Sequence, residues 1–281
     1  MKYKNLPAAT YRAGYSVNLP MKQYFFCKLI HNTPINAEIF SLDFAWPGAA
    51  PRAGQFFMIK PKRSSLFLPR PISAAFWDPS LKFIRFLIAR RGKGTGELAE
   101  LHIGEEAALM GPLGNAWDDF LSPSASKPHG EKPIALIGGG AGIAPLEALA
   151  AELSGNRFDF YAGFKTGFRN PEEKIGLLGP ALAGSASLII AAENGEEGLK
   201  GLITDFLNPA DYSAVCACGP EAMLRTAAEK CAAAGILCYV SLERRMACGV
   251  GACLGCTAAT AKGNRRCCAD GPIFPAAEVF F

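Results

Sequence analysis

The fold of this chain is decided by the stretch Ile134-Ala-Leu-Ile-Gly-Gly-Gly-Ala-Gly-Ile-Ala-Pro145, in which an apolar run leads into a cluster of glycines. The apolar run predicts a buried strand, and the glycines predict a tight turn into a helix whose opening turn tolerates the missing N–H of Pro145. The spacing is not the G-x-G-x-x-G dinucleotide fingerprint. Glycines at this density let a flat ring and a pyrophosphate approach the backbone, which predicts a nicotinamide site. Its predicted residues are Gly138, Gly139, Gly140 and Gly142.

Strand and helix signals alternate on the C-terminal side of this stretch, which predicts a parallel-sheet α/β domain over residues 131–240. The last strand of the domain runs into Cys218-Gly219-Pro220-Glu221, at the edge of a parallel sheet where ligands bind. Cys218, Gly219 and Pro220 are therefore predicted to face the same ligand as the glycine turn, although Cys218 alone is equally explained as a small buried residue. We expect strands over Ile134–Ile137, Phe158–Gly163, Ser187–Ala191 and Ala214–Ala217, and helices over Ala144–Leu153 and Glu221–Ala234.

The N-terminal side has a different pattern, in which short β-type runs are punctuated by Gly and Pro. Runs over Tyr24–Ile30, Gln55–Lys60 and Phe83–Ala89 predict strands of a small antiparallel β-barrel that spans residues 22–121. A polar, breaker-rich linker follows over residues 122–130, and residues 1–21 are read as an N-terminal extension. The chain of 281 residues is long enough for two domains and a small third one.

Two motifs in the barrel segment combine positive charge with a phosphate-binding backbone. Arg70-Pro71-Ile72-Ser73 joins a guanidinium suited to a pyrophosphate with a hydroxyl that can hydrogen-bond the reactive edge of an isoalloxazine. Arg91-Gly-Lys-Gly94-Thr95-Gly96 supplies N–H groups and a hydroxyl ahead of a helix expected over Glu97–Leu101. Each motif alone is typical of an ordinary turn. Their order, closed by Gly111-Pro-Leu-Gly114, favours a flavin site.

Four cysteines near the C-terminus have the spacing of a 2Fe-2S ligand set. Cys248, Cys253 and Cys256 form C-x4-C-x2-C, and Cys268 follows after eleven residues. Glycines let this loop curl around the inorganic sulfides, and a β-hairpin that turns near Lys262-Gly263-Asn264 would return Cys268 beside Cys256. A structural zinc site and buried free thiols are the alternatives. Zinc sites usually present paired C-x2-C knuckles, and this segment has one pair.

Cys267 competes with Cys268 as the fourth ligand. We prefer Cys268 because it stands close to the turn Asp270-Gly271-Pro272, which leaves Cys267 as a strand residue that faces the other way. The cluster segment over residues 241–281 is too short to build a core alone. It is therefore expected to depend on the metal and on packing against the rest of the chain.

Composition excludes several classes of function. The formal net charge of +4 is modest and unclustered, which gives little support to nucleic-acid binding. No run of about 18 residues is apolar and free of charges and helix breakers, so a membrane span is not expected. Ten cysteines with a Cys-ligated cluster, and no secretory signal, favour a reducing, cytoplasmic location.

The barrel motifs, the glycine turn and Cys218-Gly-Pro-Glu221, in this order, resemble the ferredoxin–NADP reductase superfamily. Together with Ser241-Leu-Glu243, Met246-Ala-Cys-Gly249 and Cys268-Ala-Asp-Gly-Pro272, they resemble the electron-transfer subunits of NAD-dependent dihydroorotate dehydrogenase over about residues 22–275. The sequence departs from the family pattern at Trp117, where Phe is usual, at Arg244, where an acidic residue is common, and at Lys165, where Arg is frequent. Lys165 leaves the choice between NAD and NADP open.

The resemblance implies three cofactors and one protein partner. The cofactors are FAD, a 2Fe-2S cluster and NAD, and the partner is an FMN-containing catalytic subunit in a heterotetramer that serves pyrimidine biosynthesis. By position, Cys248, Cys253, Cys256 and Cys268 would hold the cluster. The residues that would hold FAD are Arg70, Pro71, Ile72, Ser73, Leu87, Ile88, Ala89, Gly94 and Thr95.

The expected activity is electron transfer, without acid–base chemistry by the protein. Nicotinamide moves electrons in pairs as hydride, an iron–sulfur cluster accepts them singly, and a flavin does both. We therefore expect electrons from dihydroorotate to pass from FMN in the partner through the cluster and FAD to NAD+. No catalytic side chain is assigned, because His31, His102 and His129 all lie outside the motifs.

Two other functions remain open at this level. One is a related flavin/iron–sulfur subunit with another partner, as in a bifurcating ferredoxin–NADP reductase or a sulfide dehydrogenase. Such relatives tend to carry Asp-Gly-Thr-Gly-Met before the clustered cysteines, where this chain has Ala247-Cys-Gly-Val-Gly251. The other is a non-catalytic iron–sulfur redox sensor, which need not retain a flavin site and a nicotinamide pocket.

Overall fold

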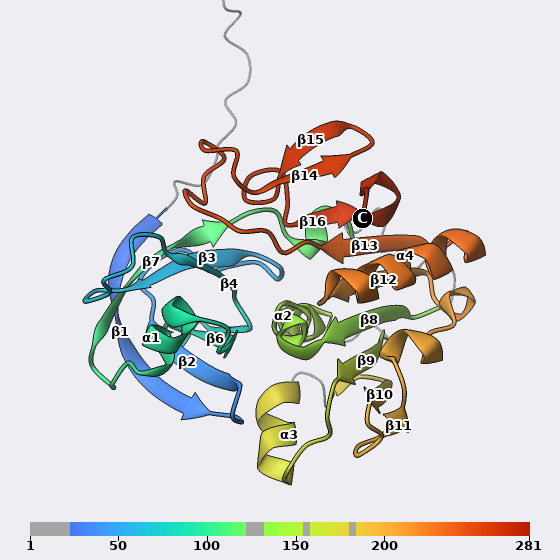
Figure 1. Cartoon of the computed structure of the whole chain (residues 1–281), viewed down its shortest axis with the longest axis horizontal. Coiled ribbons are helices and arrows are strands. Elements are labelled where there is room, and N and C mark those ends of the chain that lie inside the picture. Colours follow the sequence, from blue (N-terminus) through green and yellow to red (C-terminus); the bar gives the residue numbers. More distant parts are fainter. Residues whose placement is uncertain (1–22, 122–131, 154–157, 180–183) are drawn as a thin grey trace, which may run out of the picture.

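The computed structural model describes residues 23–121, 132–153, 158–179 and 184–281. The N-terminal extension over residues 1–21 and the linker over residues 122–130 lie outside these ranges. The described chain forms a curled antiparallel sheet, a parallel-sheet domain and a C-terminal segment beside them (Figure 1). This arrangement confirms the expected fold class. No helix in the described ranges is long and apolar enough to cross a membrane.

The first sheet is antiparallel, with the strand order β4-β3-β7-β1-β2-β6-β5, and it curls around an apolar core of its own. Aromatic rings fill much of that core: Phe57 lies edge to face against both Trp46 and Phe86, with ring centroids 4.9 and 5.5 Å apart. Such contacts add to the free energy gained from burial alone. The elements of the barrel are β1 (Gln23–Pro34), β2 (Ile39–Ala45), β3 (Phe56–Pro61), β4 (Arg70–Ser73), β5 (Phe76–Asp78), β6 (Phe83–Ala89), α1 (Lys93–Ala99) and β7 (Glu106–Leu113).

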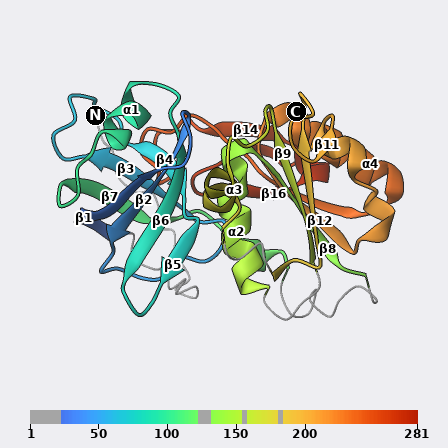
Figure 2. The same ribbon diagram turned by 90° about the horizontal axis from the view of Figure 1, so that it is seen from below.

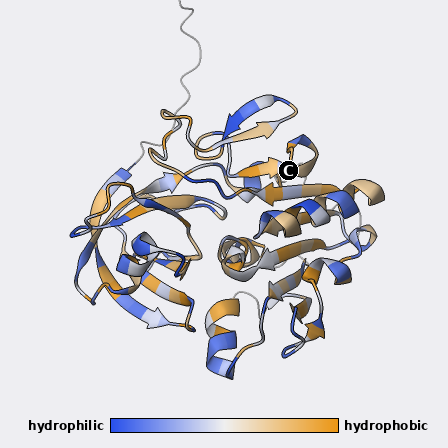
Figure 3. Cartoon of the chain, viewed as in Figure 1, coloured by the Kyte–Doolittle hydropathy of each residue, from blue (hydrophilic) through white to orange (hydrophobic). Residues whose placement is uncertain are grey.

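The second sheet has the strand order β11-β10-β9-β8-β12-β13-β16 and is parallel except for β16, which pairs antiparallel with β13. The helix α4 buries one face, with Leu224, Ala227 and Cys231 at helical spacing, and it shows polar and apolar sides (Figure 3). The strands are β8 (Ile134–Gly139), β9 (Phe158–Phe164), β10 (Ser187–Ala192), β11 (Leu199–Lys200), β12 (Ala214–Cys218), β13 (Leu237–Ser241) and β16 (Ile273–Pro275). The helices are α2 (Ile143–Glu152), α3 (Pro171–Leu178) and α4 (Glu221–Ala234).

The C-terminal segment is tied to both sheets. Its hairpin of β14 (Thr257–Thr260) and β15 (Gly263–Arg266) turns at Ala261 and Lys262, and the Cys267 N–H donates to the Cys256 carbonyl at 3.1 Å. The expected hairpin therefore forms, and it returns the chain beside Cys256. β16 then extends the parallel-sheet domain, so the segment shares the core of its neighbour.

Most expected elements agree with the structure to within a few residues, and α4 has the expected bounds. One expectation was wrong. The helix placed over Glu97–Leu101 runs instead over Lys93–Ala99, so the glycines and Thr95 lie within its first turns and not ahead of it. The Thr95 hydroxyl explains the early start, because it accepts the N–H groups of Arg91 and Gly92 at 2.9 and 3.2 Å and so closes the opening turn.

The barrel and the parallel-sheet domain lie side by side with α2 at their junction (Figure 2). Ala144 of α2 packs against Ala75 and Leu87 of the barrel in a small buried cluster. Asn115, just after β7, holds the C-terminal segment: its amide donates to the Ile273 carbonyl at 2.8 Å and its side-chain oxygen accepts the Ile273 N–H at 3.0 Å. These contacts hold the barrel, α2 and the C-terminal segment together.

Candidate functional site

A cleft of about 850 Å³ lies where the barrel, the parallel-sheet domain and the C-terminal segment meet. It collects residues that are far apart in the sequence, from Phe56 in β3 to Pro272 just before β16. Three of the predicted glycines, Gly94, Gly138 and Gly140, do not line it. The predicted residues that do are Arg70, Pro71, Ile72, Ser73, Leu87, Ile88, Ala89, Thr95, Gly139, Gly142, Cys218, Gly219 and Pro220.

The barrel wall of the cleft is built by β4 and β6. The Arg70 guanidinium folds back, donating to the Leu68 carbonyl at 2.6 Å and to the Pro69 carbonyl at 3.3 Å. It lies on Gly94, where a Cβ atom would stand only 1.9 Å from Arg70 Nε. Gly94 therefore acts by giving room to the guanidinium and not by lining the cleft. Arg91 supplies a second cation to the same wall.

The opposite wall is formed by two backbone turns in close contact. A Cβ atom on Gly142 would lie 2.4 Å from the Cys218 carbonyl oxygen, and one on Gly139 would lie 2.8 Å from Pro220 Cδ. Gly219 has φ of +152°, which a residue with a side chain rarely adopts. The bare backbone lets the turn after β8 approach the turn after β12. The surface that these two turns give to the cleft is called the glycine floor below.

Gly138 and Gly140 shape this turn from behind the floor. A Cβ atom on Gly138 would stand 2.8 Å from Ile143 Cγ1, so the missing side chain lets β8 run close to the start of α2. Gly140 has φ of +54°, in the left-handed region that favours glycine. Both residues therefore support the turn without facing the cleft.

The thiol of Cys218 lies at this floor as a neutral group. Burial raises the pKa of Cys218 to about 12, and the nearby Glu243 carboxylate adds to the shift, while a hydrogen bond with the Ser241 side chain opposes it. The thiolate is the nucleophilic form of cysteine, so a thiol that stays protonated does not serve as a nucleophile. Cys218 is suited to contact a ligand, not to attack it.

Residues 241–246 also line the cleft, and they were not assigned to it from the sequence. Glu243 is the acidic residue among them: burial raises the pKa of its carboxyl, and the Arg91 guanidinium opposes that shift. The segment reaches the cleft because β13 lies next to β12, so both strands end at the same edge of the sheet. The signal that was available is Ser241-Leu-Glu243, which directly follows a buried strand.

The four cluster cysteines come together as two pairs. Cys248 and Cys253 share a side-chain contact, and so do Cys256 and Cys268. In the described residues, no three His, Cys, Asp or Glu side chains converge as they do around a single metal ion. Two thiol pairs match the need of a 2Fe-2S cluster, in which each iron takes two protein sulfurs.

Backbone N–H groups point at these sulfurs. The Gly251 N–H donates to Cys268 Sγ at 3.1 Å, and the Val250 N–H donates to Cys248 Sγ at 3.4 Å. Such bonds stabilise negative charge on cluster ligands and tune the potential of the metal. Gly251 adopts φ of +80°, where a side chain would be strained, so the loop needs glycine there.

Cys267 is buried in the core of the parallel-sheet domain, and burial raises the pKa of its thiol to about 12. We had expected Cys267 to be a strand residue, but β15 ends at Arg266, one residue before it. Cys268, by contrast, contacts Cys256 through its side chain. The structure therefore places Cys268, and not Cys267, in the second thiol pair.

The cluster loop lies against the barrel beside the cleft. A Cβ atom on Gly249 would come within 2.6 Å of Met58 Cγ in β3, and φ of Gly249 is +68°. Met246 lines the cleft, and Cys248 follows two residues later. A group bound in the cleft and a cluster held by the cysteines would therefore be close neighbours.

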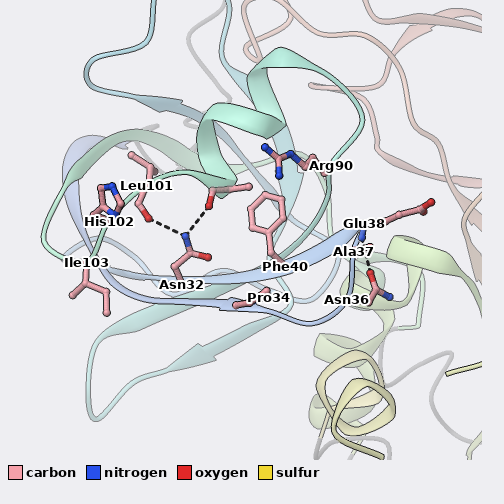
Figure 4. Close-up of a pocket in the computed structure, with 11 residues that line it drawn as sticks. Asn32, Pro34, Asn36, Ala37, Glu38, Phe40, Arg90, Leu101, His102 and Ile103 are labelled. Atoms are coloured by element: carbon pink, nitrogen blue, oxygen red, sulfur yellow. Dashed lines mark hydrogen bonds between the residues drawn. The ribbon is translucent and has the colours of Figure 1, made fainter. Parts of the chain in front are cut away.

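A second, smaller cavity of about 370 Å³ lies on the barrel between the end of β1 and the end of α1 (Figure 4). The Asn32 amide donates to the Ala99 and Leu101 carbonyls at 2.9 and 2.8 Å. Arg90, which also lines the cavity, pairs with Glu100 at 2.6 Å. These polar groups are engaged within the protein, and none of the predicted site residues lines this cavity.

Comparison with known proteins gives a consistent result. Residues 243–280 match the iron-sulfur cluster binding domain of dihydroorotate dehydrogenase B. The chain is 38% identical over 259 residues to the protein named dihydroorotate dehydrogenase B (NAD(+)), electron transfer subunit, of Clostridium perfringens, covering 92% of this chain and 99% of that one. The protein of the same name from Clostridium acetobutylicum is 34% identical, with 92% and 98% covered.

A solved structure shares the fold. It is a structure of NADH-dependent reduced ferredoxin-NADP oxidoreductase, with a TM-score of 0.75 and 24% identity, over 91% of this chain and 90% of that one. At this identity the likeness shows the fold alone. It places the barrel, the parallel-sheet domain and the C-terminal segment in an arrangement already observed in an oxidoreductase.

Proposed function

The chain belongs to the family of electron-transfer subunits of dihydroorotate dehydrogenase B (NAD(+)), and on this premise we propose that it carries electrons to NAD+. The proposed source of these electrons is an FMN-containing catalytic subunit that oxidises dihydroorotate. This places the protein in pyrimidine biosynthesis in the cytoplasm. The observation that carries the proposal is the cleft, which brings the barrel motifs, the glycine turn and the beginning of the cysteine loop to one place.

The residues at the barrel wall fit FAD. Arg70 and Arg91 place positive charge where a pyrophosphate would lie, while Ile72, Leu87 and Ile88 offer an apolar surface to a ring system. The Ser73 hydroxyl is available at the same wall as a hydrogen-bond partner. FAD supplies, when bound, the chemistry that joins hydride transfer at a nicotinamide to single-electron transfer at a cluster.

The glycine floor is the proposed nicotinamide site. Gly139, Gly142 and the segment Cys218-Gly219-Pro220 present backbone and a neutral thiol, so a flat ring can approach the backbone closely here. The two turns pack against each other closely enough that a side chain on Gly142 would clash with the backbone of Cys218. NAD is proposed as the partner of this floor because the relatives are named for NAD(+).

The cysteine pairs are the proposed ligands of the 2Fe-2S cluster: Cys248 with Cys253, and Cys256 with Cys268. Cys253 is exposed, whereas Cys256 and Cys268 are buried, so one side of the cluster loop faces outward. An outward side gives a partner protein access to this centre. We propose that this chain and its FMN-containing partner form a heterotetramer with two copies of each.

The domain limits inferred from the sequence accompany this proposal. They assign residues 22–121 to the flavin-binding barrel, 131–240 to the NAD-binding domain and 241–281 to the cluster domain. The contacts of β16 with β13 support treating the last two as one packing unit, because they share a buried core.

The proposal is tested by anaerobic co-purification of the chain with its partner, followed by an absorption spectrum, flavin chromatography and assays for iron and acid-labile sulfide. The expected result is FAD and a 2Fe-2S cluster on this chain, with an FMN protein bound to it. FAD and cluster with a different partner would retain the electron-transfer chemistry and discard dihydroorotate as the electron source. No flavin on the chain would overturn the proposal.

A further inference from the structure

A proton has to reach the cleft each time this chain forms NADH. The hydride that NAD+ accepts consists of two electrons and one proton, whereas an iron–sulfur cluster delivers single electrons without protons. Two electrons from the cluster, one proton and NAD+ together balance one NADH. A group in the cleft is therefore needed that gives up a proton for each hydride and is recharged from water.

Glu243 is the group that can do this among the described residues that line the cleft. They include no His, Lys, Asp or Tyr side chain. The arginines that line it keep their protons at every physiological pH, and the Ser and Thr hydroxyls can pass a proton on but cannot store one. The thiol of Cys218, whose pKa is raised to about 12 by burial, also keeps its proton.

Glu243 connects the two sides of the cleft. It lies two residues beyond the end of β13, which pairs with β12, so it reaches the same edge of the sheet as the glycine floor. Its carboxylate interacts electrostatically with the Cys218 thiol of that floor and with the Arg91 guanidinium of the barrel wall. The carboxyl group is therefore shared by the proposed flavin site and the proposed nicotinamide site.

The backbone of Glu243 is anchored, while its side chain stays within reach of water. The Arg244 guanidinium donates to the Glu243 carbonyl at 2.9 Å and to the Glu221 carboxylate at 3.1 Å. The Leu242 N–H donates to the Pro272 carbonyl at 2.9 Å. Glu243 itself is exposed and lines the cleft, so its carboxyl group can give a proton to the cleft and take one from solvent.

We propose that Glu243 donates the proton that joins the electrons of the cluster at FAD, an inference that rests on the proposed function. The O–H bond of the carboxyl group breaks, the proton joins two electrons at the flavin, and water returns a proton to the carboxylate. Protein atoms around the carboxyl group raise its pKa although the residue is exposed, and Arg91 opposes this shift. The raised pKa leaves more of the acid form at neutral pH than an ordinary glutamate has. This role departs from the sequence-based expectation that the protein contributes no acid–base chemistry.

The test uses the full chain with flavin and cluster bound, reduced anaerobically in a stopped-flow instrument by NADH or by reduced methyl viologen. NADH brings the proton within its hydride, whereas reduced methyl viologen gives single electrons. Flavin absorbance reports the reduction, and a pH-indicator dye reports proton uptake. The variants are Glu243→Gln, Glu243→Asp and Glu229→Gln. Glu229 is a matched control because it is an exposed glutamate of α4 that does not line the cleft.

With reduced methyl viologen, Glu243→Gln is expected to slow proton uptake and full reduction of the flavin about 100-fold. Flavin reduction by NADH should stay near the wild-type rate in the same variant. The wild-type rate with methyl viologen should fall as the pH rises through the pKa of the carboxyl group, because the acid form is the donor. Glu243→Asp should retain this pH dependence, Glu243→Gln should lose it, and Glu229→Gln should behave as the wild type does.

Two results would overturn the inference. Equal slowing with both reductants would assign Glu243 to the shape of the cleft. Proton uptake at the wild-type rate in Glu243→Gln would show that water supplies the proton directly. A wild-type chain that binds no flavin refutes the proposed function itself, so the two failures are distinguishable.

Discussion

Replacing Gly142 by Ala should damage the nicotinamide floor while leaving the cofactors of the barrel and the cysteine loop in place. Gly142 has φ of −66° and ψ of −8°, a conformation that Ala adopts without strain, so the backbone alone predicts a gain of about 0.4–1 kcal/mol. The added Cβ, however, would lie 2.4 Å from the Cys218 carbonyl oxygen and 2.7 Å from Gly219 Cα. Both are backbone atoms, so they cannot rotate away.

The two turns must therefore separate by about 1 Å to restore an ordinary contact. Overpacking of this kind typically costs about 1–3 kcal/mol, which outweighs the backbone gain. The larger effect is on reactivity, because a displacement of about 1 Å at a reacting group can lower a rate about 100-fold.

The assay is anaerobic stopped-flow reduction of the bound flavin by NADH, read from flavin absorbance. Gly142→Ala should reduce slowly with NADH and normally with dithionite, at wild-type flavin and iron content. Gly184→Ala is the matched control, since its Cβ meets nothing within 4 Å, and it should behave as the wild type. Wild-type rates with NADH in Gly142→Ala would refute the account of the floor.

Three further predictions follow from other parts of the structure. Cys268→Ser should abolish acid-labile sulfide, because Cys268 belongs to a thiol pair with Cys256. Cys267→Ser should retain the sulfide and only lower the thermal midpoint of unfolding, because Cys267 is a buried core residue. Loss of sulfide with Cys267→Ser alone would reverse the ligand assignment. Trp117→Phe should change the free energy of unfolding, measured in urea, by less than about 1 kcal/mol, because removal of the buried, unpartnered Nε1–H offsets the loss of ring volume. Trp117→Ala should cost about 3–5 kcal/mol. A large loss with Trp117→Phe would show that the N–H is paired. Burial raises the pKa of Glu147 to about 7, against the weaker opposing effect of Arg85. The folded state therefore binds more protons than the unfolded state between about pH 4.5 and 7, so the wild type loses stability as the pH rises through that range. Between these pH values the free energy of unfolding of Glu147→Gln, measured in urea, should fall by less than that of the wild type, with a difference of up to about 3 kcal/mol. The same pH dependence in both proteins would show that Glu147 titrates normally.

The local elements were predictable where the chain carries its own stop and start signals. The helix α4 has the expected bounds because Pro220 precedes it and Gly235, with φ of +68°, ends it in a left-handed cap. The helix α1 was misplaced because its first turn is built from Lys93-Gly-Thr-Gly96, which has poor helical propensity. Its formation depends on the Thr95 hydroxyl and on burial of Leu98, and neither effect is visible in a propensity pattern.

The members of the cleft were largely predictable, but their arrangement was not. Each motif marks a place where bare backbone or a charged group is needed, and such requirements can be read from residue types. That Gly94 and Gly138 support the site from behind, with contacts to Arg70 and Ile143, depends on tertiary packing. The same holds for residues 241–246, which reach the cleft only because β13 pairs with β12.

The measurement that tests the central claim most directly is NAD+ reduction by dihydroorotate in the purified complex with the FMN-containing partner, comparing the wild-type chain with Cys256→Ser. The account predicts that the wild-type complex reduces NAD+. With Cys256→Ser, dihydroorotate should still bleach the FMN of the partner while NAD+ reduction is lost, because Cys256 belongs to the buried thiol pair with Cys268. NAD+ reduction at the wild-type rate in that variant, or none in the wild-type complex, would contradict the account.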